Sequence, residues 1–291
     1  MTPTLWQGEE IEQILDLRPL GDDRFANVYA QANTNRAMFG GQMLGLALMA
    51  AARTVEDGRA PHAMHADFLA QAGTESAVDV AVSRVRDGRS FSTRHVEVAQ
   101  AGDLRFDARI SFQAPDRGFF HQVPIASDAG VPDDHPPAEA GLERYADKLT
   151  RHPVVRFTRM RSVEIRPVDF HAYAFGGEKV SSRRLWTRIP GAARIAAPVA
   201  HHALLAYLSD YWLAGTVALA HAEAMQRRRI FMATLNHSIW FSASVRVDGW
   251  LLLDTDTPSA SGGRGLVRGT FHDRDGTLVA TVVQEVLLRH L

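Results

Sequence analysis

The stretch ALLAYLSDYWLAGTVALA, residues 203–220, decides the fold, because it avoids charge almost completely and yet contains one carboxylate, Asp210. As a helix it would be roughly 27 Å long, slightly short of a bilayer core. A membrane-spanning position would also put Asp210 near mid-bilayer, at a cost of about 3 kcal/mol. The stretch is therefore predicted to be a buried helix in the centre of a globular protein.

A second stretch of the same kind occurs earlier in the chain. GGQMLGLALMAAAR, residues 40–53, carries no charge before its last residue and predicts another buried helix that starts at the glycine pair. Alternating strands follow each helix, with glycine turns between them, as in an antiparallel meander. The expected strands are residues 77–85, 90–100 and 104–114 in the first half, and 234–247, 250–257, 266–272 and 277–289 in the second.

The repeated order of helix and meander predicts a duplicated α+β unit, in which a long central helix is wrapped by an antiparallel sheet. We expect an N-terminal domain at 1–121, a linker at 122–150 and a C-terminal domain at 151–291. The linker begins with QVPIASDAGVPDDHPPAEAG, which is rich in Pro, Ala and Asp.

Composition excludes several functional classes. The net charge of -1 over 291 residues gives no general attraction to nucleic acid or to an anionic membrane, so neither is expected as a partner. The chain has no cysteine, which excludes a cysteine nucleophile, disulfides and iron–sulfur ligation, and fits a cytoplasmic protein. The N-terminus, MTPTLWQGEEIEQ, lacks the apolar core of a secretory signal.

Asp210 needs partners from outside its own helix. The positions three and four residues away hold Ala, Tyr, Leu and Ala, none of them cationic. An isolated buried carboxylate is costly, and burial raises its pKa until it neutralises. From the residues alone, a functional carboxylate and a structural one bonded to a backbone amide or an arginine are equally good interpretations.

Five stretches, in order along nearly the whole chain, resemble acyl-CoA thioesterase II, a double-hotdog thioesterase family. The resemblance implies the double-hotdog fold, hydrolysis of fatty acyl-CoA to free acid and CoA, no cofactor, and assembly into a homodimer or homotetramer. The stretches are FGGQMLGLAL (39–48), VRDGRSFSTRHVEVAQAG (85–102), SFQAPDRGFFHQ (111–122), ATLNHSIWF (233–241) and SASGGRGLVRGTFHDRDGTLVATVVQE (259–285).

The catalytic Asp, Thr and Gln of that family fall on Asp210 in SDYW, Thr234 in ATLNHS and Gln284 in VVQE. In the family these groups hold and activate a water molecule. Hydroxyl and amide groups can fix a water against a carboxylate, which then acts as general base on the thioester carbonyl. A thiol with a pKa of about 8.5 can leave as thiolate, so a strong general acid is not required.

The sequence departs from the family pattern at three places. Asn236 stands where an Asp usually precedes the His, and Asp67 stands where an aromatic residue is expected. LAQAG, residues 69–73, replaces Leu-Arg-Pro-Gly. The change at Asn236 lies beside the site and bears on rate or pH optimum, while the other two bear on the acyl or CoA channel.

Further residues are candidates for substrate binding. Backbone amides of Gly41 and Gln42 at a helix start suit an oxyanion, although close helix packing explains the glycines equally well. His62 is a candidate substrate contact. Its odd separation from His65 predicts opposite strand faces and no chelating pair, so no metal site is expected. Arg264 is a candidate for the CoA phosphates, and the basic run at 227–229 is explained by the helix dipole.

Two alternatives remain open at this point. An acyl-CoA binding or scaffold protein with little or no catalysis would explain Asn236 and the altered LAQAG segment. A hotdog dehydratase or hydratase would need a His paired with an acid near the helix. His201 and His202 lie about two helical turns from Asp210, which is too far for a direct pair along the helix.

Overall fold

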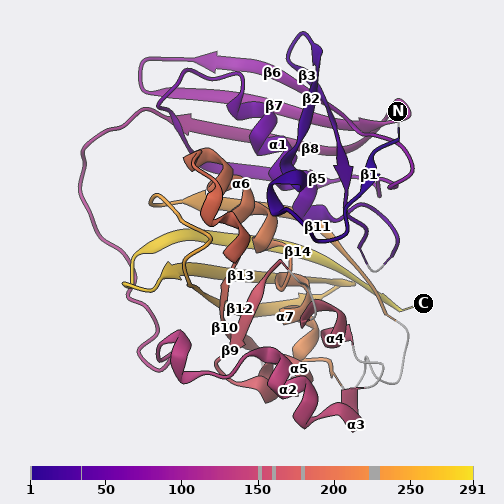
Figure 1. Ribbon diagram of the computed structural model, residues 1–291, viewed down its shortest axis with the longest axis vertical. Helices are drawn as coiled ribbons and strands as arrows, with labels where there is room; N and C mark the ends of the chain where they lie inside the picture. The colour runs from indigo at the N-terminus through magenta and orange to yellow at the C-terminus, as the bar shows by residue number, and fades with distance from the viewer. Residues whose placement is uncertain are drawn as a thin grey trace.

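The two halves of the chain place their strands in the same order (Figure 1). The computed structural model describes residues 2–33, 35–149, 153–158, 162–177, 181–222 and 230–290. The N-terminal half contributes β2 (Leu17–Gly21), β3 (Arg24–Asn27), β5 (Ala60–Phe68), β6 (Asp79–Asp87), β7 (Phe91–Gln100) and β8 (Asp103–Gln113). The C-terminal half contributes β9 (Glu164–Pro167), β10 (Ser182–Arg188), β11 (Ile230–Phe241), β12 (Leu251–Ser261), β13 (Arg264–Asp273) and β14 (Leu278–His290).

These strands form one 12-stranded sheet in the order β2-β3-β6-β7-β8-β5-β11-β14-β13-β12-β10-β9. Counted outward from the centre, β5-β8-β7-β6-β3-β2 mirrors β11-β14-β13-β12-β10-β9, as duplication predicts. The halves join where β5 and β11 pair antiparallel, with Asn236 opposite Asp67. The predicted α+β architecture, two repeats of a helix wrapped by an antiparallel sheet, is confirmed. A separate pair of short strands, β1 (Thr4–Leu5) and β4 (Tyr29–Ala30), is parallel.

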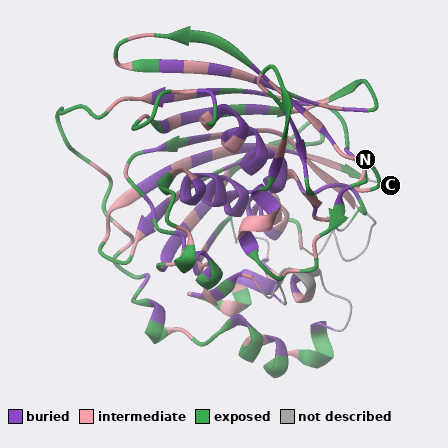
Figure 2. Ribbon diagram, turned by 45° about the horizontal axis from the view of Figure 1, so that its top comes forward, coloured by how far each residue is buried: buried purple, intermediate pink, exposed green. Residues whose placement is uncertain are grey.

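Two apolar helices, α1 (Gly40–Ala52) and α6 (Pro198–Ser209), lie side by side against the sheet. Their side chains are buried on all faces, and Leu44, Leu48, Leu204 and Leu208 are each 0% exposed. Figure 2 shows both helices in the buried centre, with exposed residues on the peripheral strands and on the helices below. No helix among the described residues is long and apolar enough to cross a membrane.

The predicted helix over 203–220 is wrong in one respect, because it is two helices. The first, α6, ends at Ser209, a turn occupies 210–212, and α7 (Leu213–Leu219) follows. The turn directs α7 onto β12 and β13, where Gly265 allows close contact: a Cβ at this position would overlap Val217. Close packing against the sheet therefore replaces continuation of a straight helix.

Two strand boundaries also differ from prediction. The strand expected to run to residue 247 ends at Phe241, and the interval between the expected strands 250–257 and 266–272 is mostly strand. Only Gly262 and Gly263 form that turn, with φ of +57° and +75°, a conformation that glycine adopts without steric cost.

The predicted linker over 122–150 is described to residue 149 and contains short helices. These are η2 (Pro132–Asp134), α2 (Ala138–Arg144) and α3 (Ala146–Leu149). The chain leaves β8 and runs down one side of the molecule to the C-terminal half (Figure 1). Gln122 fastens the start of this segment to the β13–β14 turn, donating to the Gly276 carbonyl at 2.7 Å and accepting from the Leu278 N–H at 3.1 Å. The domain boundaries stay a prediction.

The remaining helical segments surround this frame. They are η1 (Ile11–Leu15), α4 (Pro153–Thr158), α5 (Phe170–Phe175) and η3 (Pro190–Arg194).

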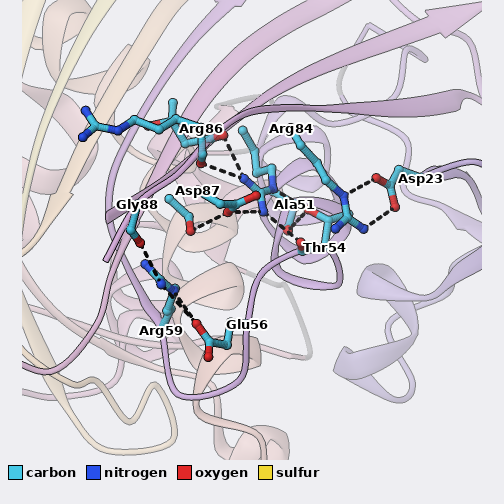
Figure 3. A network of polar contacts seen from close by, with 12 residues as sticks. Asp23, Ala51, Thr54, Glu56, Arg59, Arg84, Arg86, Asp87 and Gly88 are labelled. Carbon is cyan, nitrogen blue, oxygen red and sulfur yellow. Dashed lines mark hydrogen bonds and ion pairs between the residues drawn. The ribbon is translucent and has the colours of Figure 1, made fainter. Parts of the chain in front are cut away.

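A buried arginine secures the end of α1 to the β6–β7 hairpin. The Arg94 side chain is 1% exposed and donates to the Thr54 hydroxyl at 2.7 Å, the Thr54 carbonyl at 2.9 Å and the Asp87 carboxylate at 2.7 Å. Figure 3 shows Thr54 and Asp87 converging there, with Arg84 and Asp23 paired beside them. A buried charge is tolerated when paired and hydrogen-bonded, so this arginine is structural.

Candidate active site

Asp210 lies where the two central helices meet. It caps the C-terminus of α6 and is 8% exposed. The start of α1 faces it, since a Cβ on Gly40 would lie 2.7 Å from Asp210 Oδ2 and the backbone N–H of Gly41 faces the carboxylate. The positive end of the α1 dipole therefore meets the carboxylate, whereas α6 presents its own negative end.

Glycines in α1 permit this close approach. A Cβ on Gly41 would overlap the carbonyl oxygen of Tyr207, and a Cβ on Gly45 would lie 3.3 Å from the carbonyl oxygen of Ala203. The helices are in contact along their length. The glycines that mark the helix start in the sequence thus also bring the α1 amide groups to Asp210.

A β-bulge in β11 brings Thr234 to the helix side of the sheet. Residues three apart on a regular strand point to opposite faces. The β11–β14 register shifts between Thr234 and Asn236, so Thr234 and His237 share one face. Thr234 Oγ1 donates to Asp210 Oδ1 at 3.0 Å, and His237 Nε2 lies 2.9 Å from Ser209 Oγ.

Gln284 of β14 lies directly opposite His237 and links it to Thr234. Its Nε2 donates to Thr234 Oγ1 at 2.9 Å, and its Oε1 lies 2.8 Å from His237 Nδ1. The structure thus brings together the three residues predicted as catalytic, Asp210, Thr234 and Gln284. All three belong to one hydrogen-bonded chain.

The pKa of Asp210 is raised from 3.8 to about 7. Burial is the largest cause, and the Thr234 hydroxyl, the Gly41 N–H and the Gln284 amide oppose it by favouring the charged form. No arginine or lysine in the described ranges pairs with this carboxylate. Burial also lowers the pKa of His237 to about 4, so its imidazole is neutral at working pH. Asp210 is therefore the member of this hydrogen-bonded chain whose pKa lies near neutral pH.

Gln42 was predicted to bind substrate, but its side chain forms hydrogen bonds within the fold. Its side chain accepts from the Gln31 N–H at 2.8 Å and donates to the carbonyls of Ile14 at 3.0 Å and Tyr29 at 2.9 Å. Its backbone N–H donates to the Phe39 carbonyl. Of the two amides predicted to face an oxyanion, only that of Gly41 faces the site.

His62 lies away from Asp210. It stands at a register shift in β5 and contacts the ring of Phe91 at 5.5 Å between centroids. It lies six positions before Phe68, the β5 residue whose ring approaches Gly40 beside Asp210, which is roughly 20 Å along a strand. The prediction that His62 and His65 point to opposite faces is wrong, because the bulge turns both to the outer face, where His65 bonds Ser238 at 2.9 Å.

Arg264 is also separated from Asp210. It is exposed on the outer face of β13, and its Nε lies 2.8 Å from Glu285 Oε1. Gln284, the next residue along β14, faces the helices instead. The basic run at 227–229 lies outside the described residues.

Two departures from the family pattern, Asp67 and Asn236, face each other across β5 and β11. Asn236 also donates to Glu285 Oε2 at 3.3 Å. A carboxylate at position 236 would lie between the carboxylates of Asp67 and Glu285, and like charges directly opposite each other on paired strands are destabilising. The amide is thus explained by its outer-face neighbours, and it takes no part in the hydrogen-bonded chain that ends at Asp210.

Sequence reasoning missed Ser209 and His237. Each is 0% exposed, and each has its side chain engaged in the chain that reaches Asp210. The signals in the sequence were a Ser directly before the lone acid and a His three residues after Thr234. Regular strand alternation predicts that His237 and Thr234 point to opposite faces of the sheet, which argues against a contact between His237 and the site. No group of metal-ligating side chains occurs within the described residues.

Comparison with known proteins agrees with this arrangement. Residues 154–287 match a family described as acyl-CoA thioesterase, and residues 30–113 match one described as acyl-CoA thioesterase N-terminal domain. Acyl-coenzyme A thioesterase 8 of Homo sapiens is 32% identical over 290 residues, covering 96% of this chain and 88% of the relative. The chain belongs to the acyl-CoA thioesterase family.

Solved structures of relatives have the same fold. An acyl-CoA thioesterase II from Mycobacterium marinum has a TM-score of 0.79 and 32% identity, covering 97% of this chain and 98% of that one. A protein from Alicyclobacillus acidocaldarius described as having a hot dog fold has a TM-score of 0.75 at 21% identity, covering 96% and 97%, and supports the fold alone. The double-hotdog architecture and the family resemblance predicted from the sequence are confirmed. As a member of this family, the chain is a thioester hydrolase.

Proposed function

We propose that this acyl-CoA thioesterase hydrolyses fatty acyl-CoA to free acid and CoA with Asp210 as the general base. The observation that carries the proposal is a buried carboxylate whose pKa is about 7 and which lies at the end of a chain of oriented neutral donors. Such a base is largely ionised just above neutral pH and still binds a proton readily.

In the proposed reaction, a water molecule against Asp210 attacks the thioester carbonyl while the carboxylate takes its proton. A new carbon–oxygen bond forms, and the carbonyl oxygen becomes an oxyanion. The positive end of the α1 dipole, which faces Asp210, stabilises this oxyanion. The carbon–sulfur bond then breaks, and the thiolate leaves. Asp210 finally returns its proton to the thiolate or to solvent.

Thr234 and Gln284 hold the Asp210 carboxylate in the ionised and oriented form that a general base needs. The Thr234 hydroxyl occupies Asp210 Oδ1, so the second oxygen, Oδ2, is the one left to face water. This second oxygen lies beside Gly40, where a Cβ would come within 2.7 Å of it, so glycine keeps a side chain from crowding it. Both neutral residues also hold the pKa of Asp210 below the value that burial alone would give.

The test is release of CoA thiol from a panel of acyl-CoA esters by wild type and by Asp210→Asn. General-base contributions predict a loss in kcat of roughly a hundredfold or more in the variant. Asp57→Asn, an exposed aspartate beyond the other end of α1, is the matched control and should match wild type. Equal turnover by wild type and Asp210→Asn would reject the assignment.

The same experiment addresses the alternative of a binding or scaffold protein. That alternative predicts tight acyl-CoA binding by calorimetry with no hydrolysis in wild type. The pKa of Asp210 near neutrality favours hydrolysis, because a binding protein gains nothing from a buried acid that costs stability when it ionises.

Assembly into a homodimer or homotetramer is part of the same proposal. The sheet ends in two edge strands, β2 and β9, and unpaired edges invite pairing. Light scattering should give a mass of two or four times 32.1 kDa, and a monomer at micromolar concentration would contradict it. The cytoplasmic location and the lack of a nucleic-acid partner stay predictions.

A further inference from the structure

The hydrogen-bonded chain around Asp210 begins and ends on neighbouring residues. From Asp210 it passes through Thr234 at 3.0 Å, Gln284 at 2.9 Å and His237 at 2.8 Å, and it reaches Ser209 at 2.9 Å. Ser209 directly precedes Asp210 at the end of α6. Ser209, His237 and Gln284 are 0% exposed and Asp210 is 8% exposed, whereas Thr234 is partly buried, so little water competes for the bonds at the Ser209 end.

Counting hydrogens fixes the direction of every bond when Asp210 is ionised. A carboxylate only accepts, so the single hydroxyl hydrogen of Thr234 is donated to it. Thr234 Oγ1 must then accept, and the group facing it must be the NH₂ of Gln284. The carbonyl oxygen of Gln284 therefore faces His237, whose Nδ1 must carry a hydrogen.

The count continues to Ser209. A neutral imidazole with hydrogen on Nδ1 has a bare Nε2, which accepts the hydroxyl hydrogen of Ser209. That hydroxyl also lies 2.8 Å from the Ala206 carbonyl, the competing acceptor for its one hydrogen. Every bond in the chain then points toward Asp210, and bonds aligned in this way strengthen one another.

We propose that His237 and Ser209 are positioning residues of the hydrolytic site, which fix the orientation of the Gln284 amide and so direct the Thr234 hydrogen to Asp210. This inference rests on the proposed function. It also extends that function, because it assigns a task to two buried residues that do not touch the carboxylate.

Loss of the His237 Nδ1 donor has a defined consequence. The Gln284 amide can then reverse and present its oxygen to Thr234, whose only hydrogen goes to Gln284 instead of Asp210. The carboxylate loses a donor, and its pKa rises. Among the described residues, Tyr211 of the same turn is the titratable group whose pKa Asp210 raises, and the start of α1 presents the Gly41 amide.

The first test reads the tautomer directly and needs no substrate. ¹⁵N NMR of histidine-labelled wild type, with the signal of His237 assigned by comparison with His237→Asn, should show hydrogen on Nδ1 and a bare, hydrogen-bonded Nε2. Hydrogen on Nε2 with a bare Nδ1 would overturn the proposal, whatever the activity of the enzyme.

The second test is kinetic. His237→Leu should lower kcat about tenfold with little change in KM, and should move the acid limb of the pH–rate profile to higher pH. His237→Asn retains an amide donor near the Nδ1 position and should recover much of the loss. His202→Leu is the matched control, because this buried histidine hydrogen-bonds the Pro198 carbonyl of its own helix and packs against Phe241, away from the chain that reaches Asp210.

The outcomes separate this inference from the proposed function. An unchanged acid limb and an unchanged kcat in His237→Leu would overturn the positioning role while Asp210→Asn still loses activity. Full activity in Asp210→Asn would instead reject the general base. If His237→Leu does not fold, Ser209→Ala removes the donor at the far end of the chain and should raise the same apparent pKa.

Discussion

The ionisation of Asp210 should cost the folded protein stability, and Asp210→Asn should reveal that cost. Burial raises the pKa of Asp210 from 3.8 to about 7, so the folded state holds this proton more tightly than the unfolded state. A group with a raised folded pKa stabilises the protein less as pH rises from its unfolded pKa, and this loss is complete above its folded pKa. Asparagine does not titrate and escapes this loss.

The magnitude follows from the shift. About three pKa units at 1.36 kcal/mol each amount to about 4 kcal/mol over the whole range. About 2 kcal/mol of this falls between pH 5.5 and pH 8, where the assay is practical. For a chain of 291 residues that corresponds to roughly 3 °C in Tm. The side chain is 8% exposed, so solvent screening reduces the value little.

The assay is urea unfolding of wild type and Asp210→Asn at several pH values from 5.5 to 8. The difference in free energy of unfolding between the two proteins should grow in favour of the variant as pH rises. The absolute difference in free energy of unfolding also contains the cost of placing an amide beside the Gly41 N–H. The test is therefore the change of this difference with pH. Asp57→Asn serves as the exposed control. A difference that does not change with pH would refute the reasoning.

Three further changes have defined outcomes. Thr234→Val removes a donor from Asp210, so the acid limb of the pH–rate profile should move to higher pH and kcat at pH 7 should fall about tenfold. Gly41→Ala places a Cβ against a carbonyl oxygen of α6 and should lower the free energy of unfolding by about 3 kcal/mol in urea titrations. Asn236→Asp should lower it by about 0.5 kcal/mol, and Asp67→Asn in the same protein should restore it.

Each of these changes has its own control. Thr234→Ser keeps the hydroxyl and should keep the acid limb in place. Gly191→Ala adds a Cβ whose nearest neighbour is 3.7 Å away and should be tolerated. Full stability of Gly41→Ala would contradict the close helix contact. Additive effects of Asn236→Asp and Asp67→Asn would contradict their cross-strand coupling.

The layout of the fold could be predicted from the sequence because its signals are local. An apolar run such as 40–53 must be buried whichever element covers it, and alternating runs with glycine turns pair as neighbouring antiparallel strands. The repeat of this order predicted the two mirrored halves of the sheet. The prediction that Asp210, Thr234 and Gln284 act together rested on the family resemblance. No local pattern relates residues so far apart in sequence.

The remaining features depend on tertiary contacts. Nothing in the apolar run over 203–220 marks Ser209 as a helix end, since the break serves the packing of α7 against β13. The bulges at Leu235 and His62 reverse strand alternation, and with it the faces that alternation assigns. Gln42 has the composition of a binding residue, but three backbone groups of the N-terminal segment take up its side chain.

The pH dependence of kcat/KM tests the central claim most directly, because it reports the ionisation of the base in the free enzyme. With acyl-CoA as substrate, kcat/KM should rise about tenfold per pH unit below neutrality and level off above an apparent pKa of about 7, the value of Asp210. A profile that is flat from pH 5 to pH 8 would contradict the claim that this carboxylate activates the water.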